Sequence, residues 1–242
     1  MKNKSFVISS IISLLLLVVL VGSSGAGGGS GGASSPPNVT LNNPINYYNT
    51  TTTNISCNFT VSDDFDASLN CNLTINNLVN ITNIVAANGT SQINTTNNFN
   101  DGIYYWNVTC RDSLNNTNTS VTRKFAVDTL APTTNINGIS TSSINAGQTV
   151  HIWANWTDAT TGVKTVKLIV NGFVNKTNNT GLTVGSEATY NFSYVTSTLQ
   201  IGATLNFTIN ATDYAGNENS TTLLQVTVMD NTPPNLLLVS PI

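Results

Sequence analysis

Charged side chains are scarce in this chain of 242 residues, where they make up 8% of the sequence. Eight Lys and Arg residues stand against eleven Asp and Glu residues, so the formal net charge is −3. Nucleic-acid binding needs clustered basic side chains that displace counterions from phosphates. No Lys/Arg cluster occurs beyond the extreme N-terminus. We therefore predict no nucleic-acid partner, and a soluble anionic partner is disfavoured on the same ground.

The combinations of residues that carry out catalysis are also missing. His151 is the only histidine, so no histidine pair can hold a metal. Outside the Gly/Ser-rich leader no serine is framed by glycines as a nucleophile, and no isolated pair of carboxylates stands in an apolar setting that would split them into acid and base. We predict no catalytic residue and no enzymatic activity. His151 and Trp153 point outward in the expected strand, and Trp153 is interpreted as a contact for a sugar or partner, or as a residue shielded by neighbouring strands or by the other module.

No segment sustains a helical period, whereas β-branched Thr, Val and Ile are abundant. Apolar and polar residues alternate, which is the pattern of a strand with one buried face. The sequence therefore predicts an all-β chain. The expected core positions of the first half are Ile55, Cys57, Phe59, Val61, Leu69, Cys71, Leu73, Ile75, Tyr104, Trp106, Val108 and Cys110. Those of the second half are Val150, Ile152, Ala154, Trp156, Val166, Leu168, Val170, Leu205, Phe207, Ile209 and Ala211.

The chain repeats itself and then begins a third time. The segment 36–41 recurs in outline at 131–136 and again at 233–238. The interval is roughly a hundred residues, the length of one β-sandwich module. Residues 57–60, 73–77 and 106–112 match residues 154–157, 168–172 and 207–213. The sequence thus predicts two tandem sandwiches followed by the incomplete start of a third repeat.

The N-terminus has the composition of an export signal. Lys2 and Lys4 precede an apolar run over residues 6–21, and small residues at 24–26 offer a cleavage site. We expect residues 1–26 to be a signal peptide, the alternative being an uncleaved membrane anchor. A Gly/Ser-rich leader follows at 27–35, and we expect it to be flexible. Either interpretation places the rest of the chain outside the cytoplasm, extracellular or at the cell surface.

Several motifs resemble the immunoglobulin-like repeats of bacterial and archaeal cell-surface proteins. They are the run 213–217 (DYAGN), the junctions 127–132 and 230–234, and the Asp101-Gly102 turn before Tyr104, Tyr105 and Trp106. The resemblance implies immunoglobulin-like sandwiches at 36–129 and 130–230, with 231–242 as a partial third repeat. It implies a spacer, an adhesin or an appendage of a surface enzyme. Antibody-type recognition loops are not implied, because the second core strand has no Trp and Val108 replaces the expected Tyr.

Three cysteines in an exported chain leave one without an intramolecular partner. Cys57 and Cys110 both correspond to Ala in the second half, at Ala154 and Ala211, whereas Cys71 corresponds to Val166. This paired loss predicts a disulfide between Cys57 and Cys110. A Cys57–Cys71 bridge and the absence of any bridge remain alternatives. Cys71 is then expected to be a buried free thiol.

Sequons for N-linked glycosylation are frequent, with about eighteen after Ala26 against about nine for random placement. Alternating Asn and Thr on a wet strand face produce sequons without selection for sugar, because residues two apart share a face. Attached glycan would nevertheless hydrate a surface with few charges. We predict glycosylation at several sites, with Asn58, Asn72, Asn107, Asn155 and Asn206 as the candidates.

Acidic residues in two loops suggest a calcium site. Asp63, Asp64 and Asp66 lie in one loop, and Asp112 lies in a loop expected at the same end of the sandwich. Carboxylates are the hard ligands that Ca²⁺ prefers, although Asp also serves in turns by satisfying backbone N–H groups. The junction residues Asp128 and Asp230 are further candidates. No cofactor is required by the sequence, and calcium is the one it can accommodate.

These features predict a non-catalytic surface or secreted glycoprotein that acts as a stalk or adhesion module. Its partners would be other surface proteins or glycans, with membrane contact only through an uncleaved N-terminus. Two alternatives stay open: the accessory region of a larger surface protease or glycosidase, and a carbohydrate-binding module that uses Trp153.

Overall fold

The computed structural model describes residues 34–234. The expected signal peptide, most of the leader and most of the third repeat start lie outside the described residues. Regular structure in the described part is almost entirely strand, and no helix there is long and apolar enough to cross a membrane.

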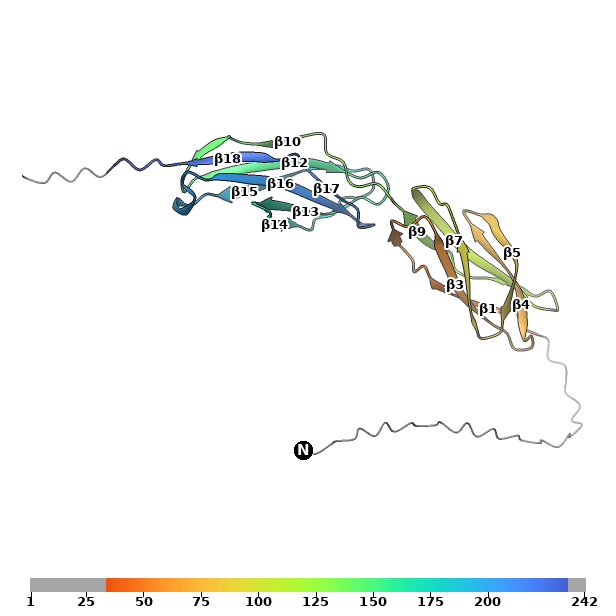
Figure 1. Cartoon of the computed structure of the whole chain (residues 1–242). Helices are drawn as coiled ribbons and strands as arrows, with labels where there is room; N and C mark the ends of the chain where they lie inside the picture. Colours follow the sequence, from red (N-terminus) through yellow and green to blue (C-terminus); the bar gives the residue numbers. More distant parts are fainter. Residues whose placement is uncertain (1–33, 235–242) are drawn as a thin grey trace, which may run out of the picture. The chain divides into compact units, whose positions relative to one another are not determined.

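Two sheets form the first module (Figure 1). Its strands are β1 (Asn38–Asn43), β2 (Tyr48–Thr50), β3 (Ile55–Ser62), β4 (Ser68–Ile75), β5 (Leu78–Ala87), β6 (Ser91–Thr96), β7 (Gly102–Arg111), β8 (Thr117–Thr119) and β9 (Arg123–Val127). One sheet has the order β1-β3-β6 and the other β2-β9-β7-β4-β5, with β8 paired to β7. The pairing is antiparallel except between β2 and β9, which run parallel.

The second module repeats this arrangement strand for strand. It consists of β10 (Asn137–Ile139), β11 (Ser143–Asn145), β12 (Thr149–Thr157), β13 (Val163–Val170), β14 (Phe173–Asn178), β15 (Glu187–Val195), β16 (Thr204–Asp213), β17 (Glu218–Ser220) and β18 (Leu224–Met229), with a short 3₁₀ turn, η1 (Thr198–Gln200). Its sheets have the orders β10-β12-β15 and β11-β18-β16-β13-β14, with β17 paired to β16. Even the parallel pair recurs, between β11 and β18. The chain therefore contains two tandem immunoglobulin-like sandwiches.

Each module has its own apolar core, and the two cores share no residue. Every core position expected from the alternation is buried, except Tyr104, which is partly buried and packs against the first core. Trp106 in β7 and Phe207 in β16 occupy matching central places with no measurable exposure. The prediction of an all-β chain of two sandwiches is confirmed.

Matching tight turns connect the central strands to the edge strands β5 and β14. Asn76 and Asn77 have φ of 50° and 63°, and Asn171 and Gly172 have φ of 50° and 85°. Two successive residues with positive φ are typical of the hairpin turn whose twist fits antiparallel strands, and Asn and Gly tolerate it best. Each hairpin therefore follows from two residues of local sequence.

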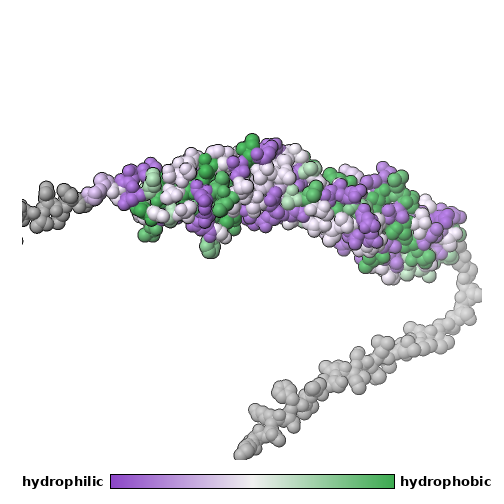
Figure 2. Space-filling model, turned by 45° about the horizontal axis from the view of Figure 1, so that its top comes forward, coloured by the Kyte–Doolittle hydropathy of each residue, from purple (hydrophilic) through white to green (hydrophobic). Residues whose placement is uncertain are grey.

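The surface has few broad apolar areas on the face that Figure 2 shows, where green residues are interrupted by purple and white ones. Exposed large apolar side chains occur on β5 and β14, at Leu78, Val79, Phe173 and Val174. These two strands end their sheets, so their outer edges have no strand partner in the described residues.

Candidate functional site

Three aspartates converge in the loops at one end of the second module. Asp128 follows β9, Asp158 follows β12, and Asp213 ends β16. Their exposed fractions are 0%, 5% and 0%. One carboxylate oxygen from each lies within 4.8 Å of the others, and within residues 34–234 no other three acidic, His or Cys side chains come so close.

The loop after β12 holds Asp158 in place through its own backbone. The Oδ1 atom accepts hydrogen bonds from the backbone N–H groups of Thr160, Thr161 and Gly162, at 3.1, 2.8 and 2.7 Å. Gly162 has φ of 85°, and a Cβ there would lie 2.4 Å from the carbonyl oxygen of Leu182. Only glycine fits this position, so the loop geometry that presents Asp158 depends on it.

Asp213 is held by the residues that follow it. Its Oδ1 accepts N–H bonds from Gly216 at 2.6 Å and Asn217 at 2.9 Å, and its Oδ2 accepts one from Asn217 Nδ2 at 2.8 Å. The first module repeats this device, because Asp112 accepts from Asn116 N and Nδ2 at 2.7 Å each. The Asp-to-Asn spacing of four is thus a structural feature of both modules, and it was visible in the sequence.

Asp128 brings the third carboxylate from the connection between the modules. Its Oδ2 accepts a hydrogen bond from Thr161 Oγ1 at 2.6 Å, and its backbone N–H donates to Thr50 O at 2.9 Å. Burial raises the pKa of Asp128, the Thr161 hydroxyl opposes this, and the charges of Asp158 and Asp213 raise it further. Three buried carboxylates repel one another. A hard divalent cation such as Ca²⁺ is the ion whose preferred ligands they provide.

The four aspartates expected to bind calcium do not form such a group. Asp63 Oδ1 accepts the backbone N–H groups of Phe65 and Asp66, Asp66 Oδ2 accepts that of Ser113, and Asp64 Oδ2 accepts Ser35 Oγ. Asp112 is held as described above. These carboxylates serve as turn and loop caps. The loops do lie at the end of the module where the sequence placed them, but the close acidic group is formed by Asp128 of the connection with two residues of the second module.

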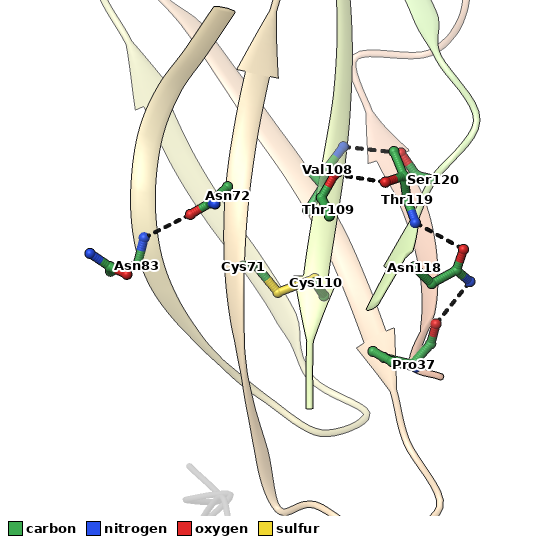
Figure 3. Close-up of a disulfide and its surroundings, with 10 residues drawn as sticks. All are labelled: Pro37, Cys71, Asn72, Asn83, Val108, Thr109, Cys110, Asn118, Thr119 and Ser120. Atoms are coloured by element: carbon green, nitrogen blue, oxygen red, sulfur yellow. Dashed lines mark hydrogen bonds between the residues drawn. A yellow bond between two sulfur atoms is a disulfide. The ribbon is translucent and has the colours of Figure 1, made fainter. Parts of the chain in front are cut away.

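The predicted disulfide between Cys57 and Cys110 is wrong, because Cys110 is joined to Cys71 (Figure 3). Cys71 and Cys110 are directly opposed in the register of β4 and β7, with Cα atoms 4.1 Å apart. Cys57 lies on β3 in the facing sheet and is the free cysteine of the described residues. The comparison of the two halves indicated the wrong pair, because Cys71 aligns with Val166 and not with Ala. The loss of this disulfide partner in the second module was therefore not recognised.

Cys57 is enclosed in the first core with no measurable exposure. Burial raises the pKa of its thiol to about 12. The thiolate is the reactive form of cysteine, so this side chain is inert at neutral pH and behaves as a small apolar residue.

All five asparagines proposed as glycan acceptors make side-chain hydrogen bonds. The partners are Asn42 and Ser91 for Asn58, Asn83 for Asn72, Thr122 for Asn107, Ile136 and Glu187 for Asn155, and Gln225 for Asn206. Asn155 is 3% exposed, and its Oδ1 accepts the N–H of Ile136 at 2.9 Å while its Nδ2 donates to Glu187. The folded module has no room for a sugar there, so the prediction for Asn155 is corrected. Its place on the outward face was right, but the segment before β10 covers it.

Trp153 lies on the outer face of its sheet, as expected, and is half-buried. Its register partner on β10 is Gly138, and a Cβ on Gly138 would lie 2.6 Å from the indole Cζ2. The ring therefore rests on a glycine of the neighbouring strand. His151 is exposed two residues earlier, and its Nδ1 is 3.1 Å from Ser193 Oγ.

A scan with protein-family models and a search of curated proteins found no match. Solved structures match at low identity. The fibronectin(III)-like modules of Clostridium thermocellum CbhA are 12% identical, with 84% of this chain and 100% of that chain covered and a TM-score of 0.48. An ICAM-5 D1–D4 ectodomain fragment is 15% identical, with 80% and 54% covered and a TM-score of 0.46. Chicken CNTN1 FN1–FN3 domains are 9% identical, with 81% and 68% covered and a TM-score of 0.45. These likenesses concern the fold and say nothing of a ligand.

Proposed function

We propose that this chain is a non-catalytic extracellular spacer, a stalk of tandem modules that is exported, glycosylated and able to carry an adhesive contact. One observation carries the proposal: the segment between the two modules is hydrogen-bonded to both of them. A spacer needs such a connection, because a free linker would let consecutive modules turn independently.

The bonds to the first module come from two residues of the connection. Asp128 N donates to Thr50 O at 2.9 Å. Thr129 donates to Asp101 Oδ1 from its backbone N at 2.9 Å and from its Oγ1 at 3.0 Å. Asp101 belongs to the turn into β7, so a core strand of the first module supports this end.

The bonds to the second module come from Thr161, whose Oγ1 donates to Asp128 Oδ2, and from two asparagines in or next to β17. Asn217 Nδ2 donates to Asp128 O at 2.9 Å and to Leu130 O at 3.0 Å. Asn219 Nδ2 donates to Pro132 O at 2.9 Å. Since Asn217 also holds Asp213, one side chain joins the acidic group to the connection.

The test is to measure the distribution of distances between two spectroscopic labels, one attached to each module. We expect a narrow distribution for the natural chain and a broader one for Asn217→Ala, because the substitution removes two of the bonds to the connection and one that holds Asp213. Asn116→Ala is the matched control, since Asn116 makes the same bonds to Asp112 but lies in the first module. A distribution that is equally broad in all three proteins would refute the spacer.

The adhesive contact is proposed to use Trp153. An indole resting on Gly138 presents a flat apolar ring, which suits stacking against a sugar or an aromatic partner. A glycan array with natural protein and Trp153→Ala checks this point. A reproducible hit that survives the substitution would remove Trp153 from the contact.

A further inference from the structure

Three sequons recur at matching places in the two modules. The pairs are Asn58 with Asn155, Asn118 with Asn219, and Asn80 with Asn175. The two modules are otherwise dissimilar in sequence, so a sequon that is kept at the same place in both indicates a structural or chemical role. The hydrogen bonds show which pairs have a structural role.

Structure accounts for the first two pairs. Asn155 is buried and bonded through both Oδ1 and Nδ2, and Asn58 is partly buried and accepts two hydrogen bonds at Oδ1. Asn118 and Asn219 each donate from Nδ2 to a proline carbonyl at 2.9 Å, and the hydroxyls of their sequons, on Ser120 and Thr221, accept the N–H groups of Val108 and Ile209 at 3.1 and 3.0 Å. Both the Asn and the Ser/Thr of that sequon are therefore required by the fold.

The third pair occupies a β-bulge in each edge strand. Leu73 faces Ile81 and Thr74 faces Val79, so Asn80 has no partner in the ladder between them. In the second module Leu168 faces Lys176 and Ile169 faces Val174, and Asn175 is skipped in the same way. A bulged residue is released from strand pairing, and its side chain is directed away from the regular ladder.

Nothing in the described fold requires the third sequon. Asn80, Thr82, Asn175 and Thr177 are all exposed. Asn80 Oδ1 accepts a bond from Thr96 Oγ1 at 2.8 Å, which leaves its Nδ2 free, and Asn175 makes no side-chain hydrogen bond within residues 34–234. The atom to which a sugar would be attached is thus accessible in both modules, unlike that of Asn118 or Asn219.

Large apolar side chains next to these two sequons are exposed to solvent. Leu78 and Val79 are 74% and 54% exposed, and Phe173 and Val174 are 79% and 59% exposed. An exposed apolar edge strand is a template for pairing with another chain, and proteins protect such edges with bulges, charges or a covering group. Neither edge strand has a strand partner beyond it in the described part of the chain.

We propose that Asn80 and Asn175 are N-glycosylated, and that the two glycans cover the equivalent edge strands β5 and β14. This rests on the proposed export of the chain. The donor is a lipid-linked oligosaccharide diphosphate used by the oligosaccharyltransferase of the exporting cell. The amide Nδ2 forms a bond to C1 of the first sugar, the bond between C1 and the phosphate oxygen breaks, the amide loses a proton to a base of the transferase, and the lipid diphosphate leaves.

The experiment is glycopeptide mass spectrometry on protein exported by the cells that naturally make it. We expect sugar on the peptides that contain Asn80 and Asn175, and none on those that contain Asn118, Asn155 or Asn219. Bare Asn80 and Asn175, or equal occupancy at Asn118 and Asn219, would overturn the proposal.

Matched variants separate the acceptor chemistry from folding. Thr82→Ala and Thr177→Ala keep both asparagines but remove the sequons, so each should lose one glycan, whereas Thr82→Ser and Thr177→Ser should keep it. The doubly unglycosylated protein should self-associate more strongly in sedimentation, because the four apolar side chains are uncovered. A glycan retained by the Ala variants would contradict the assignment. The distance measurement between modules does not depend on sugar, so failure here leaves the spacer function separately testable.

Discussion

The disulfide makes the two modules unequal under mechanical load. Cys71 and Cys110 are 39 positions apart and lie on neighbouring strands of one sheet. When the first module unfolds under force, the chain between them stays inside a closed loop and cannot extend. At about 3.4 Å per residue this hides roughly 130 Å of chain. The first module should therefore lengthen by that much less than it does when reduced, whereas the second module, which has no cysteine, is unaffected by reduction.

Single-molecule force spectroscopy measures these two increments directly. Reductant should lengthen the shorter increment by roughly 130 Å and leave the other unchanged. The double variant Cys71→Val/Cys110→Ala copies the pair Val166 and Ala211 of the second module, and it should behave as reduced protein. It should also lose about 4 kcal/mol of stability in the first module, the chain-entropy value for a loop of this size. Equal increments in oxidised protein, or no response to reductant, would refute the reasoning.

Other predictions concern buried groups. In the presence of a chelator, the free energy of unfolding should fall as the pH rises from 3.8 through the raised pKa of Asp128, because the folded state disfavours the charged form of this carboxyl. Urea unfolding of Asp128→Asn should show a weaker dependence of this free energy on pH. Trp106 has an unpartnered indole N–H, and Phe207 fills the matching place, so Trp106→Phe should cost under about 1.5 kcal/mol and Trp106→Ala about 3–5 kcal/mol in chemical denaturation. Asn155→Ala should cost about 1–3 kcal/mol by leaving Ile136 N unpaired, and an unchanged midpoint would contradict the bonding described. Thermal unfolding with and without chelator checks calcium, and midpoints that stay fixed for both modules would remove that expectation.

The core was predictable because alternation reports directly which side of a strand is buried. The alternation was nevertheless not used in full, because β1, β15 and β18 also alternate and bury core residues that were not expected. Two other strands carry no such signal: every residue of β14 is exposed or half-exposed, and β5 is exposed over its first half. Edge strands of this kind are defined by the neighbour they pair with. The disulfide escaped prediction for a related reason, since register between β4 and β7 is a property of two distant segments and cannot be read from either alone.

The aspartates show that the sequence alone does not determine the pKa of a side chain. Asp128 follows β9 and Asp230 follows β18, so the two occupy the same place in the repeat. Hydrogen bonds from Thr232 lower the pKa of Asp230, which is exposed. Burial and the charges of Asp158 and Asp213 raise the pKa of Asp128, although the Thr161 hydroxyl opposes the rise. The direction of the pKa shift of Asp128 is thus set by the burial and the charges around it, which its place in the repeat does not reveal. The sequence could name both residues as candidates, but only the fold shows that Asp158, Thr161 and Asp213 surround Asp128.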